Sequence, residues 1–420
     1  MNTKIPQPVP LGLKKSFGYG DRLGLATPGH LAAHNKFDFA PIFAQQSIRE
    51  MERTQRTPQE VMTAAQQSLA KAGFSKPWGA DADHLKEPEH VDRTAAVGFC
   101  FFTIDPSAFV VNDADTMNQS ALEQAVKKLV TDKVFESADW EKLYLNRTFD
   151  VGSLKFTFTQ EQLWRAAVKY ARAIAHSEKM GKHIAKVHGS KPYEIEVSVD
   201  ETDSATSPLE HLFFGLELKR RGVKNVVSLA PRFVGDFEKG IDYKGDVKLF
   251  ETKLKEHVAI AKHCGPYKIS VHSGSDKFTA YPIVGRVCGD LLHVKTAGTS
   301  YLEALRVVAR ENTGLFAEIT QYCRGRFETD RKSYHISTTQ KQVESLPPYS
   351  GTKDEAAYLD EIPGRQLLHV TFGSVLTIGA DAKGRKFKDG ILEVLRTNES
   401  MHVEFLDRHF TKHLSLLSKG

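Results

Sequence analysis

The stretch YEIEVSVDETDSATSPLEHLFFGLELKRRGVKNVVSLAPRF, residues 193–233, decides the fold. Its first part alternates apolar and polar residues, which is the pattern of a strand with one face against helices. Ser207 and Pro208 then open an amphipathic segment that ends at Gly222, as expected for a capped helix. A second apolar run follows at 225–233. A strand, a helix and a strand of these lengths predict a parallel βαβ unit.

The same alternation of strand and helix patterns recurs along the chain. Helical patterns cover 245–265 and 300–314, and the second has Ser300 as its cap, Glu303 at capping-box spacing and Gly314 as its stop. Strands that alternate with helices form a parallel sheet, and eight of them close into a barrel. We therefore predict an α/β fold, a TIM-like (β/α)8 barrel with helical insertions. The predicted strands are 16–22, 75–84, 97–107, 193–202, 225–233, 267–276, 291–300 and 366–374.

Residues 1–420 are predicted to form one barrel domain with two insertions. Residues 107–165 contain helical patterns but no clear core strand, and residues 315–364 are expected between the seventh and eighth strands. A doubly wound sheet is the alternative fold. Its GxGxxG motif is missing, because the nearest match, GYGDRLG at 18–24, has a different spacing.

Composition and charge exclude several classes of function. The 57 basic and 52 acidic residues give a formal net charge of +5, and they are interspersed rather than gathered in the basic stripe of a nucleic-acid binder. The four cysteines include no CxxC pair, which favours reduced thiols. The N-terminal residues lack the apolar core of a signal peptide, and no apolar stretch is long enough to span a bilayer. We expect a cytoplasmic protein that binds neither nucleic acid nor membranes, and a homo-oligomer stays open.

Strand parity places polar side chains inside the predicted barrel. In EIEVSVDE, residues 194–201, the apolar residues share the outward face. Glu196, Ser198 and Asp200 then point inward, and Glu201 lies at the lip. By the same rule, the other inward residues are Asp105, Arg232, Ser270, His272, His293, Lys295, His369 and Thr371.

The inward histidines indicate a metal site. Barrel active sites lie at the carboxyl ends of the strands, where His272, His293 and His369 are expected at similar depth. Imidazoles with a nearby carboxylate suit a divalent cation of the Zn, Mn, Co or Ni type. A single strand histidine is more often a hydrogen-bonded core residue, and that alternative stays open.

The loops after the predicted strands offer groups for an anionic substrate. In the KTAGTSY loop, Thr296 and Ser300 would present hydroxyls beside a helix N-terminus and the inward Lys295. The SGSDKF loop adds Ser275 and Lys277, which could bind sugar hydroxyls or a carboxylate. The structural alternatives are helix capping by Ser300, an ion pair of Lys295 with Asp200 or Asp105, a rim salt bridge for Arg232, and, favoured for Asp81 and Asp83, helix capping.

These segments resemble the tagaturonate/fructuronate epimerase family, which includes related ketohexose 4-epimerases. The resemblance runs in order along nearly the whole chain and is weak only in 107–165 and 340–362. It implies interconversion of D-tagaturonate and D-fructuronate in hexuronate catabolism with a divalent metal. It also places the family's acid–base and metal residues on Asp200, Glu201 and the strand histidines. The matching segments are KSFGYGDRLGLATPGH (15–30), WGADADHLK (78–86), FFTIDPS (101–107), EVSVDETD (196–203), FEKGIDYKGD (237–246), SVHSGSDKF (270–278), HVKTAGTSYLEALR (293–306) and LLHVTFGSVL (367–376).

The implied reaction inverts a carbinol carbon β to the ketone, whose C–H bond the carbonyl does not acidify. We therefore expect a retro-aldol cleavage and recombination on the opposite face of the aldehyde. Asp200 is the expected base, and a metal held by Glu201 and the histidines would stabilise the enediolate. Lys295 would bind the carboxylate or assist the carbonyl, with a Schiff base on Lys295 as a variant.

Other functions stay open on the sequence alone. The same scaffold could carry a sugar aldolase or a ketose isomerase, and fructose and tagatose are alternative substrates. A non-catalytic sugar-acid-binding protein is a further alternative. His335 lies in the second predicted insertion and could reach over the barrel mouth as a ligand or proton donor.

Overall fold

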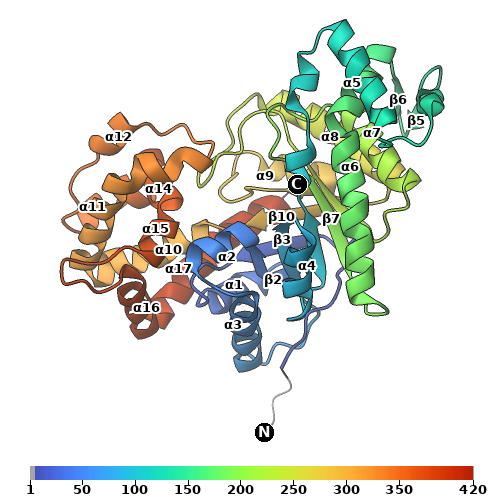
Figure 1. Cartoon of the computed structure of the whole chain (residues 1–420). Helices are drawn as coiled ribbons and strands as arrows, with labels where there is room; N and C mark the ends of the chain where they lie inside the picture. Colours follow the sequence, from blue (N-terminus) through green and yellow to red (C-terminus); the bar gives the residue numbers. More distant parts are fainter. Residues whose placement is uncertain (1–4, 420) are drawn as a thin grey trace.

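The structure, a computed structural model described for residues 5–419, contains a closed barrel of eight parallel strands (Figure 1). The strands follow one another around the ring in chain order, and the last pairs with the first through Ser16 and His293. The predicted (β/α)8 barrel is therefore confirmed. The strands are β1 (Ser16–Gly20), β2 (Ala40–Ser47), β3 (Gly79–Leu85), β4 (Phe101–Ile104), β7 (Glu194–Val199), β8 (Val226–Pro231), β9 (Lys268–Val271) and β10 (Leu292–Thr296).

A ring of helices packs around the barrel, each helix against the next. Within residues 5–419, every helix is either too short or too polar to cross a lipid bilayer. The helices of the ring are α1 (Thr27–His34), α3 (Pro58–Lys71), α4 (Pro88–Ala95), α6 (Gln160–His188), α7 (Pro208–Arg220), α8 (Val247–Cys264), α9 (Tyr281–Cys288) and α17 (Glu399–Ser418).

The remaining elements form two additions to the barrel. Predicted insertion 107–165 contains α5 (Gln119–Thr131) and a hairpin of β5 (Thr148–Val151) and β6 (Leu154–Thr157). A helical group with its own apolar core lies on the other side of the barrel in Figure 1. Its helices are α10 (Thr299–Glu311), α11 (Thr313–Asp330), α12 (Gln340–Glu344), α13 (Glu355–Leu359), α14 (Ile362–Val370), α15 (Phe372–Thr377) and α16 (Phe387–Thr397). The short α2 (Ile48–Thr54) packs on α15.

The predicted eighth strand, 366–374, is wrong, because this segment is helical. It forms the end of α14 and the start of α15, and Leu367 and Leu368 are fully buried in the core of the helical group. A short apolar run suits a buried strand or a buried helix equally well, so periodicity could not separate the two. Residues 315–364 therefore follow the last barrel strand and do not lie between two strands.

The strand absent from the prediction is β2, with the sequence APIFAQQS. Pro41 near its start and the polar residues at its end hide the strand pattern. In the barrel, Gln45 is buried and donates to the backbone carbonyl of Thr296 at 3.0 Å, so a polar side chain here is a core residue. The segments 267–276 and 291–300 consequently hold the seventh and eighth strands rather than the sixth and seventh.

Helix ends agree with the sequence in one case and differ in another. Helix α7 has the predicted start, with Ser207 and Glu210 forming a capping box. Helix α10 begins at Thr299, and no side chain caps it, so the capping box predicted for Ser300 and Glu303 is wrong. The Glu303 carboxylate accepts instead from the Arg306 guanidinium at 3.0 Å.

The C-terminal helix α17 completes the helical ring between α9 and α1. Phe410, in this helix, is fully buried against the rings of Phe17 and Tyr19 on β1. Since β1 and β10 close the barrel, this contact seals the closure point with apolar side chains. The chain therefore needs its last helix to cover its first strand.

Replacing Phe410 with Ala should lower the free energy of unfolding by about 3–5 kcal/mol, because it leaves a cavity beneath α17. Denaturant unfolding followed by circular dichroism measures this change. Ile378→Ala is the control, since that side chain is 59% exposed and its loss should change stability by less than about 0.5 kcal/mol. Equal effects of the two substitutions would contradict the sealing role of Phe410.

Candidate active site

The carboxyl end of the barrel contains a buried ion cluster around Lys295. The Lys295 ammonium lies 2.7 Å from Asp81, 2.8 Å from Asp83 and 2.9 Å from Glu196, and it donates to the Thr103 hydroxyl. Burial alone would lower the pKa of Lys295, but the three carboxylates raise it well above its usual range. Lys295 points inward as predicted, and it is a charged group that neutralises buried acids.

His84 joins this cluster from the end of β3. Its φ of +53° and a register shift between Ala82 and Leu85 let it face the same cavity as Asp83. His84 Nδ1 lies 3.0 Å from Asp105 Oδ2, and Nε2 lies 3.9 Å from Asp83 Oδ2. Burial lowers the pKa of His84, but these carboxylates outweigh it and raise the pKa to about 10. The same hydrogen bond offsets burial at Asp105 and holds the pKa of that carboxyl below its usual range.

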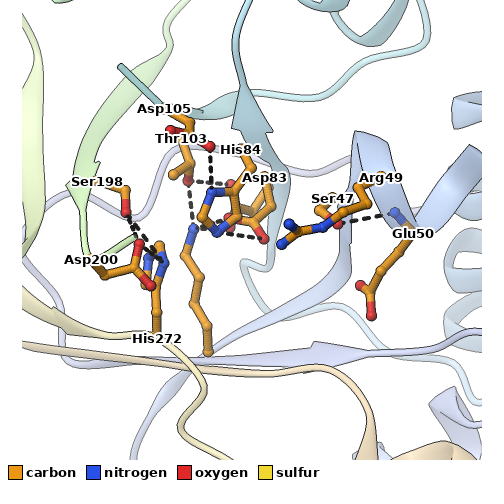
Figure 2. Close-up of polar contacts among 12 residues, drawn as sticks. Ser47, Arg49, Glu50, Asp83, His84, Thr103, Asp105, Ser198, Asp200 and His272 are labelled. Atoms are coloured by element: carbon orange, nitrogen blue, oxygen red, sulfur yellow. Dashed lines mark hydrogen bonds and ion pairs between the residues drawn. The ribbon is translucent and has the colours of Figure 1, made fainter. Parts of the chain in front are cut away.

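His272 follows β9 and faces His84 across the barrel mouth (Figure 2). Its Nε2 lies 2.5 Å from Glu196 Oε1, and its Nδ1 lies 3.4 Å from Asp200 Oδ1. The Ser198 hydroxyl also donates to Asp200. Burial lowers the pKa of His272, whereas Asp200 and Glu196 raise it, and the net result is about 9. For Asp200, burial is outweighed by His272, so the pKa of this carboxyl is lowered and it is ionised at neutral pH.

These side chains include a group with the geometry of a metal site. The ligand atoms of Asp83, His84 and His272 all lie within 4.8 Å of one another, and His84, Asp105 and Glu201 form an overlapping group. Imidazole nitrogens with carboxylate oxygens are the donor set of Zn, Mn, Co and Ni. The carboxylates that raise the pKa of both imidazoles would attract a divalent cation in the same way. The residues present therefore fit such a cation.

Of the predicted metal ligands, His272 and Glu201 lie in these groups, and His293 and His369 do not. His293 is deeper in the barrel, where its Nδ1 lies 3.0 Å from the Ser16 hydroxyl and burial lowers its pKa well below the usual value. His369 comes from α14 rather than from a strand, yet it is buried and lines the same cavity as His272. Within residues 5–419, the three predicted histidines do not converge on one point.

Lys277 has a structural role that differs from the predicted contact with substrate. Its ammonium is buried and donates to the backbone carbonyls of Glu238 at 2.8 Å, Ile241 at 2.5 Å and Ser275 at 2.9 Å. Burial lowers the pKa of Lys277 to about 7. These three hydrogen bonds tie the loop after β8 to the loop after β9. Ser275 itself lines the inner cavity, so it keeps a place at the site.

Two other predicted substrate-binding residues are also engaged within the protein. The Thr296 hydroxyl donates to the Gly18 carbonyl at 2.7 Å, and the Ser300 hydroxyl lies 2.9 Å from His30 Nε2. The first contact joins β10 to β1, and the second joins α10 to α1. Arg232 lines the outer part of the cavity, where it was expected.

The ion cluster opens into a cavity with two parts. The inner part, about 60 Å³, reaches Asp83, Lys295 and His369. The outer part, about 470 Å³, extends to Arg232 and to the exposed His335, whose Nε2 lies 3.3 Å from Asp236. Both parts are lined by Arg49, Asp200, Lys239, His272, Ser273 and Tyr334.

Several residues of this cavity were missed by sequence reasoning. Asp81 and Asp83 were assigned to helix capping, although their alternation in GADADH places both on one face of β3, where they meet Lys295. Strand parity would put His84, the next residue, on the opposite face, and only its positive φ turns it toward the cavity. Arg49 lies just after the unpredicted β2, and Lys239 lies in a loop, so neither carried a periodic signal.

Fold and site together define a class of protein. In (β/α)8 barrels the carboxyl ends of the strands form the active site, and here that end holds ionised carboxylates, imidazoles and a cavity. These groups suit an enzyme that moves protons, and they include candidate ligands for a metal ion.

Comparison with known proteins identifies the family. The sequence model of the tagaturonate epimerase family matches residues 1–417. The tagaturonate/fructuronate epimerase of Thermotoga maritima is 43% identical over 413 residues, which cover 98% of this chain and 82% of that protein. The crystal structure of the native fructuronate–tagaturonate epimerase UxaE of Cohnella laeviribosi matches with a TM-score of 0.90 and 37% identity, covering 98% of this chain and 83% of that one. A structure of the same enzyme with one glycerol matches with a TM-score of 0.91.

The chain belongs to the tagaturonate epimerase family. It is accordingly a sugar-acid epimerase, an isomerase of carbohydrates.

Metal binding should depend steeply on pH. With pKa values of about 10 and 9, His84 and His272 are protonated at neutral pH, and a metal needs neutral imidazoles, so binding must displace both protons. Affinity for Mn²⁺ or Ni²⁺ should therefore rise with pH, by up to roughly 100-fold per unit between about pH 6 and 8. Calorimetric titration at several pH values measures this. His84→Ala should weaken binding and reduce the slope to about tenfold per unit, because only the His272 proton is then displaced, and His335→Ala should leave the slope unchanged. An affinity independent of pH would contradict the assignment.

Proposed function

We propose that this enzyme interconverts D-tagaturonate and D-fructuronate with a divalent metal ion. The observation that carries the proposal is the meeting of Asp83, His84, His272 and Asp200 at one cavity, in a chain of the tagaturonate epimerase family. Asp200 is ionised and lines both parts of the cavity, so it can accept a proton from a bound sugar. We place the enzyme in the cytoplasm, because its four cysteines are buried free thiols.

The chemistry of the substrate limits the mechanism. The two uronates differ at a carbinol carbon β to the ketone, so removal of its C–H proton would give no stabilised carbanion. Oxidation by a nicotinamide would need a phosphate-binding loop, but Gly18 and Gly20 lie within strand β1, where a Cβ on Gly18 would collide with Gln45. Cleavage of the bond between the α and β carbons is the route that these residues favour.

In this route Asp200 takes the proton of the hydroxyl on the β carbon. The electron pair left on this oxygen forms the second C–O bond of an aldehyde, the α–β carbon bond breaks, and its electrons pass to the ketone fragment as an enediolate. The aldehyde fragment turns, the carbon–carbon bond forms again on the opposite face, and Asp200 returns the proton to the new hydroxyl. No atom is gained or lost. His272 and Ser198 hold the carboxylate of Asp200 in place for both transfers.

A divalent cation bound by Asp83, His84 and His272 would act as a Lewis acid toward the negative charge that develops on the ketone oxygen. Glu201 lies in the overlapping group and would support it. Glu201 also pairs with Arg49 at 2.8 Å, which fixes its carboxylate at the cavity wall.

Lys295 has a supporting role in this proposal. Its ammonium is surrounded by three carboxylates, which keep Asp83 and Glu196 oriented toward the two histidines. A Schiff base requires a neutral amine, and the raised pKa of Lys295 opposes that form. A sugar aldolase on the same scaffold would share the first cleavage but release the two fragments. The cavity gives no reason to release them before they recombine.

The direct test is an epimerase assay of the purified protein. We expect D-tagaturonate and D-fructuronate to reach the same equilibrium mixture from either side, and exhaustive chelation to remove the activity. Addition of Mn²⁺, Co²⁺, Ni²⁺ or Zn²⁺ should restore it. Fructose and tagatose, assayed in parallel, show whether neutral ketohexoses are also turned over. Full activity after chelation, with no metal found by elemental analysis, would remove the metal from the mechanism. Accumulation of three-carbon products would indicate an aldolase.

Asp200→Asn should lower kcat by about 10²–10⁴-fold, because the amide cannot accept the hydroxyl proton. Metal affinity should stay near the wild-type value, since Asp83, His84 and His272 remain. The matched control is Asp203→Asn, the same chemical change at an exposed residue of the outer cavity, and it should keep at least half of the activity. Rates from chromatographic product analysis measure both variants. An Asp200→Asn variant with wild-type kcat would assign the proton transfer to another group.

A further inference from the structure

Lys239 lies at the junction of the two parts of the cavity, in the loop of residues 232–246 that joins β8 to α8. Side chains from outside the loop bind backbone carbonyls on both sides of Lys239. Lys277 binds the carbonyls of Glu238 and Ile241, and the Arg365 guanidinium donates to the carbonyl of Gly240 at 2.8 Å. The loop backbone around Lys239 is therefore fixed, with its side chain directed into the cavity.

The charge of Lys239 has no anionic partner among residues 5–419. Its ammonium donates to the Ser273 hydroxyl at 2.6 Å, and no carboxylate oxygen lies within 4 Å of it. The other cations of the inner cavity are all paired. Arg22 binds Glu50 at 2.7 Å, Arg49 binds Glu201 at 2.8 Å, and Lys295 lies among its three carboxylates. An ammonium group has three protons to donate, so Lys239 has two free for a ligand.

We propose that Lys239 and the Ser273 hydroxyl form the binding site for the substrate carboxylate, and that this site selects uronates over neutral ketohexoses. The inference rests on the proposed function, which it makes more specific. A half-buried cation without a partner favours an anion over a hydroxyl, because only an anion balances its charge.

The position of this site suits the reaction. Ser273 directly follows His272 in the chain, so the ammonium lies beside the cluster of histidines and carboxylates without joining it. In the uronates, one carbon separates the carboxylate from the carbon that is inverted. A carboxylate on Lys239 would thus place the reacting carbon near Asp200, which lines the same part of the cavity. After cleavage the aldehyde fragment carries this carboxylate, so Lys239 would hold the fragment in the site while it turns.

Arg232 is the competing cation. Its side chain makes no hydrogen bond or ion pair within residues 5–419, but it lines only the outer part of the cavity. It is therefore farther along the cavity from Lys295 and His369 than Lys239, which lines both parts. We assign the carboxylate to Lys239, and substitution of both residues distinguishes the two.

The first measurement is steady-state kinetics of Lys239→Met with D-tagaturonate and D-fructuronate. We expect KM to rise about 10- to 100-fold, the loss of one charge-assisted hydrogen bond, with kcat within about threefold. Lys239→Arg should recover most of the affinity, because it keeps the charge. Arg232→Met should leave KM within about threefold. An unchanged KM in Lys239→Met, or a large rise only in Arg232→Met, would overturn the assignment.

The second measurement is direct binding, which separates this inference from the proposed function. D-Gluconate and sorbitol are six-carbon chains that differ in a carboxylate, and calorimetry measures the affinity of each. Wild type should bind gluconate more tightly than sorbitol, and Lys239→Met should remove the difference while its melting temperature stays within a few degrees. If wild type shows this preference but epimerises neither uronate, the anion site stands and the proposed reaction fails. Equal binding of gluconate and sorbitol by wild type would contradict the proposed anion site, even if the enzyme epimerises the uronates.

Discussion

The ammonium group of Lys295 lies among three buried carboxylates, and the rest of the site depends on this arrangement. Asp81 and Asp83 come from β3, Glu196 from β7 and Lys295 from β10, so the ion cluster exists only when the barrel is closed. Three carboxylates without a cation could not stay ionised together in a buried position. Barrel closure therefore brings together the charges of the active site, and the Lys295 ion pairs in turn stabilise the closed barrel.

The cluster also divides its carboxylates into two kinds. Burial raises the pKa of Asp81 to about 7, whereas His84 and Lys295 offset burial at Asp83 and bring its pKa to about 2. Asp83 is thus an ionised candidate ligand at the cavity wall. Asp81 is buried behind it and pairs with Lys295. His84 contacts the carboxylates of the cluster from the end of β3, where its positive φ releases it from strand parity, and His272 contacts them from just after β9.

Strand parity predicted much of this from sequence, because the face of a side chain is a local property. Glu196 and Lys295 point inward as expected, and Asp200 and His272 follow their strands into the cavity. Parity fails where the element itself is misassigned, as at His369, which reaches the cavity from a helix. The ion pairs of Lys295 could not be predicted from sequence, because its partners lie about 100 to 200 residues away along the chain. The register of the barrel strands brings them together. Loop residues such as Lys239 follow no helix or strand periodicity, so the sequence pattern does not show which way their side chains point.

The cavity has to accommodate an acid beside carboxylates of the protein. Asp83 and Asp200 line the inner part, and each would repel a substrate carboxylate placed beside it. A metal ion held by the two histidines would offset part of that repulsion. Arg49 and Lys239 also line the inner part of the cavity, and Arg49 is already neutralised by Glu201. The unpaired ammonium of Lys239 would then be the charge that attracts an anion, and it would orient the sugar chain with its acid toward the loop of residues 232–246.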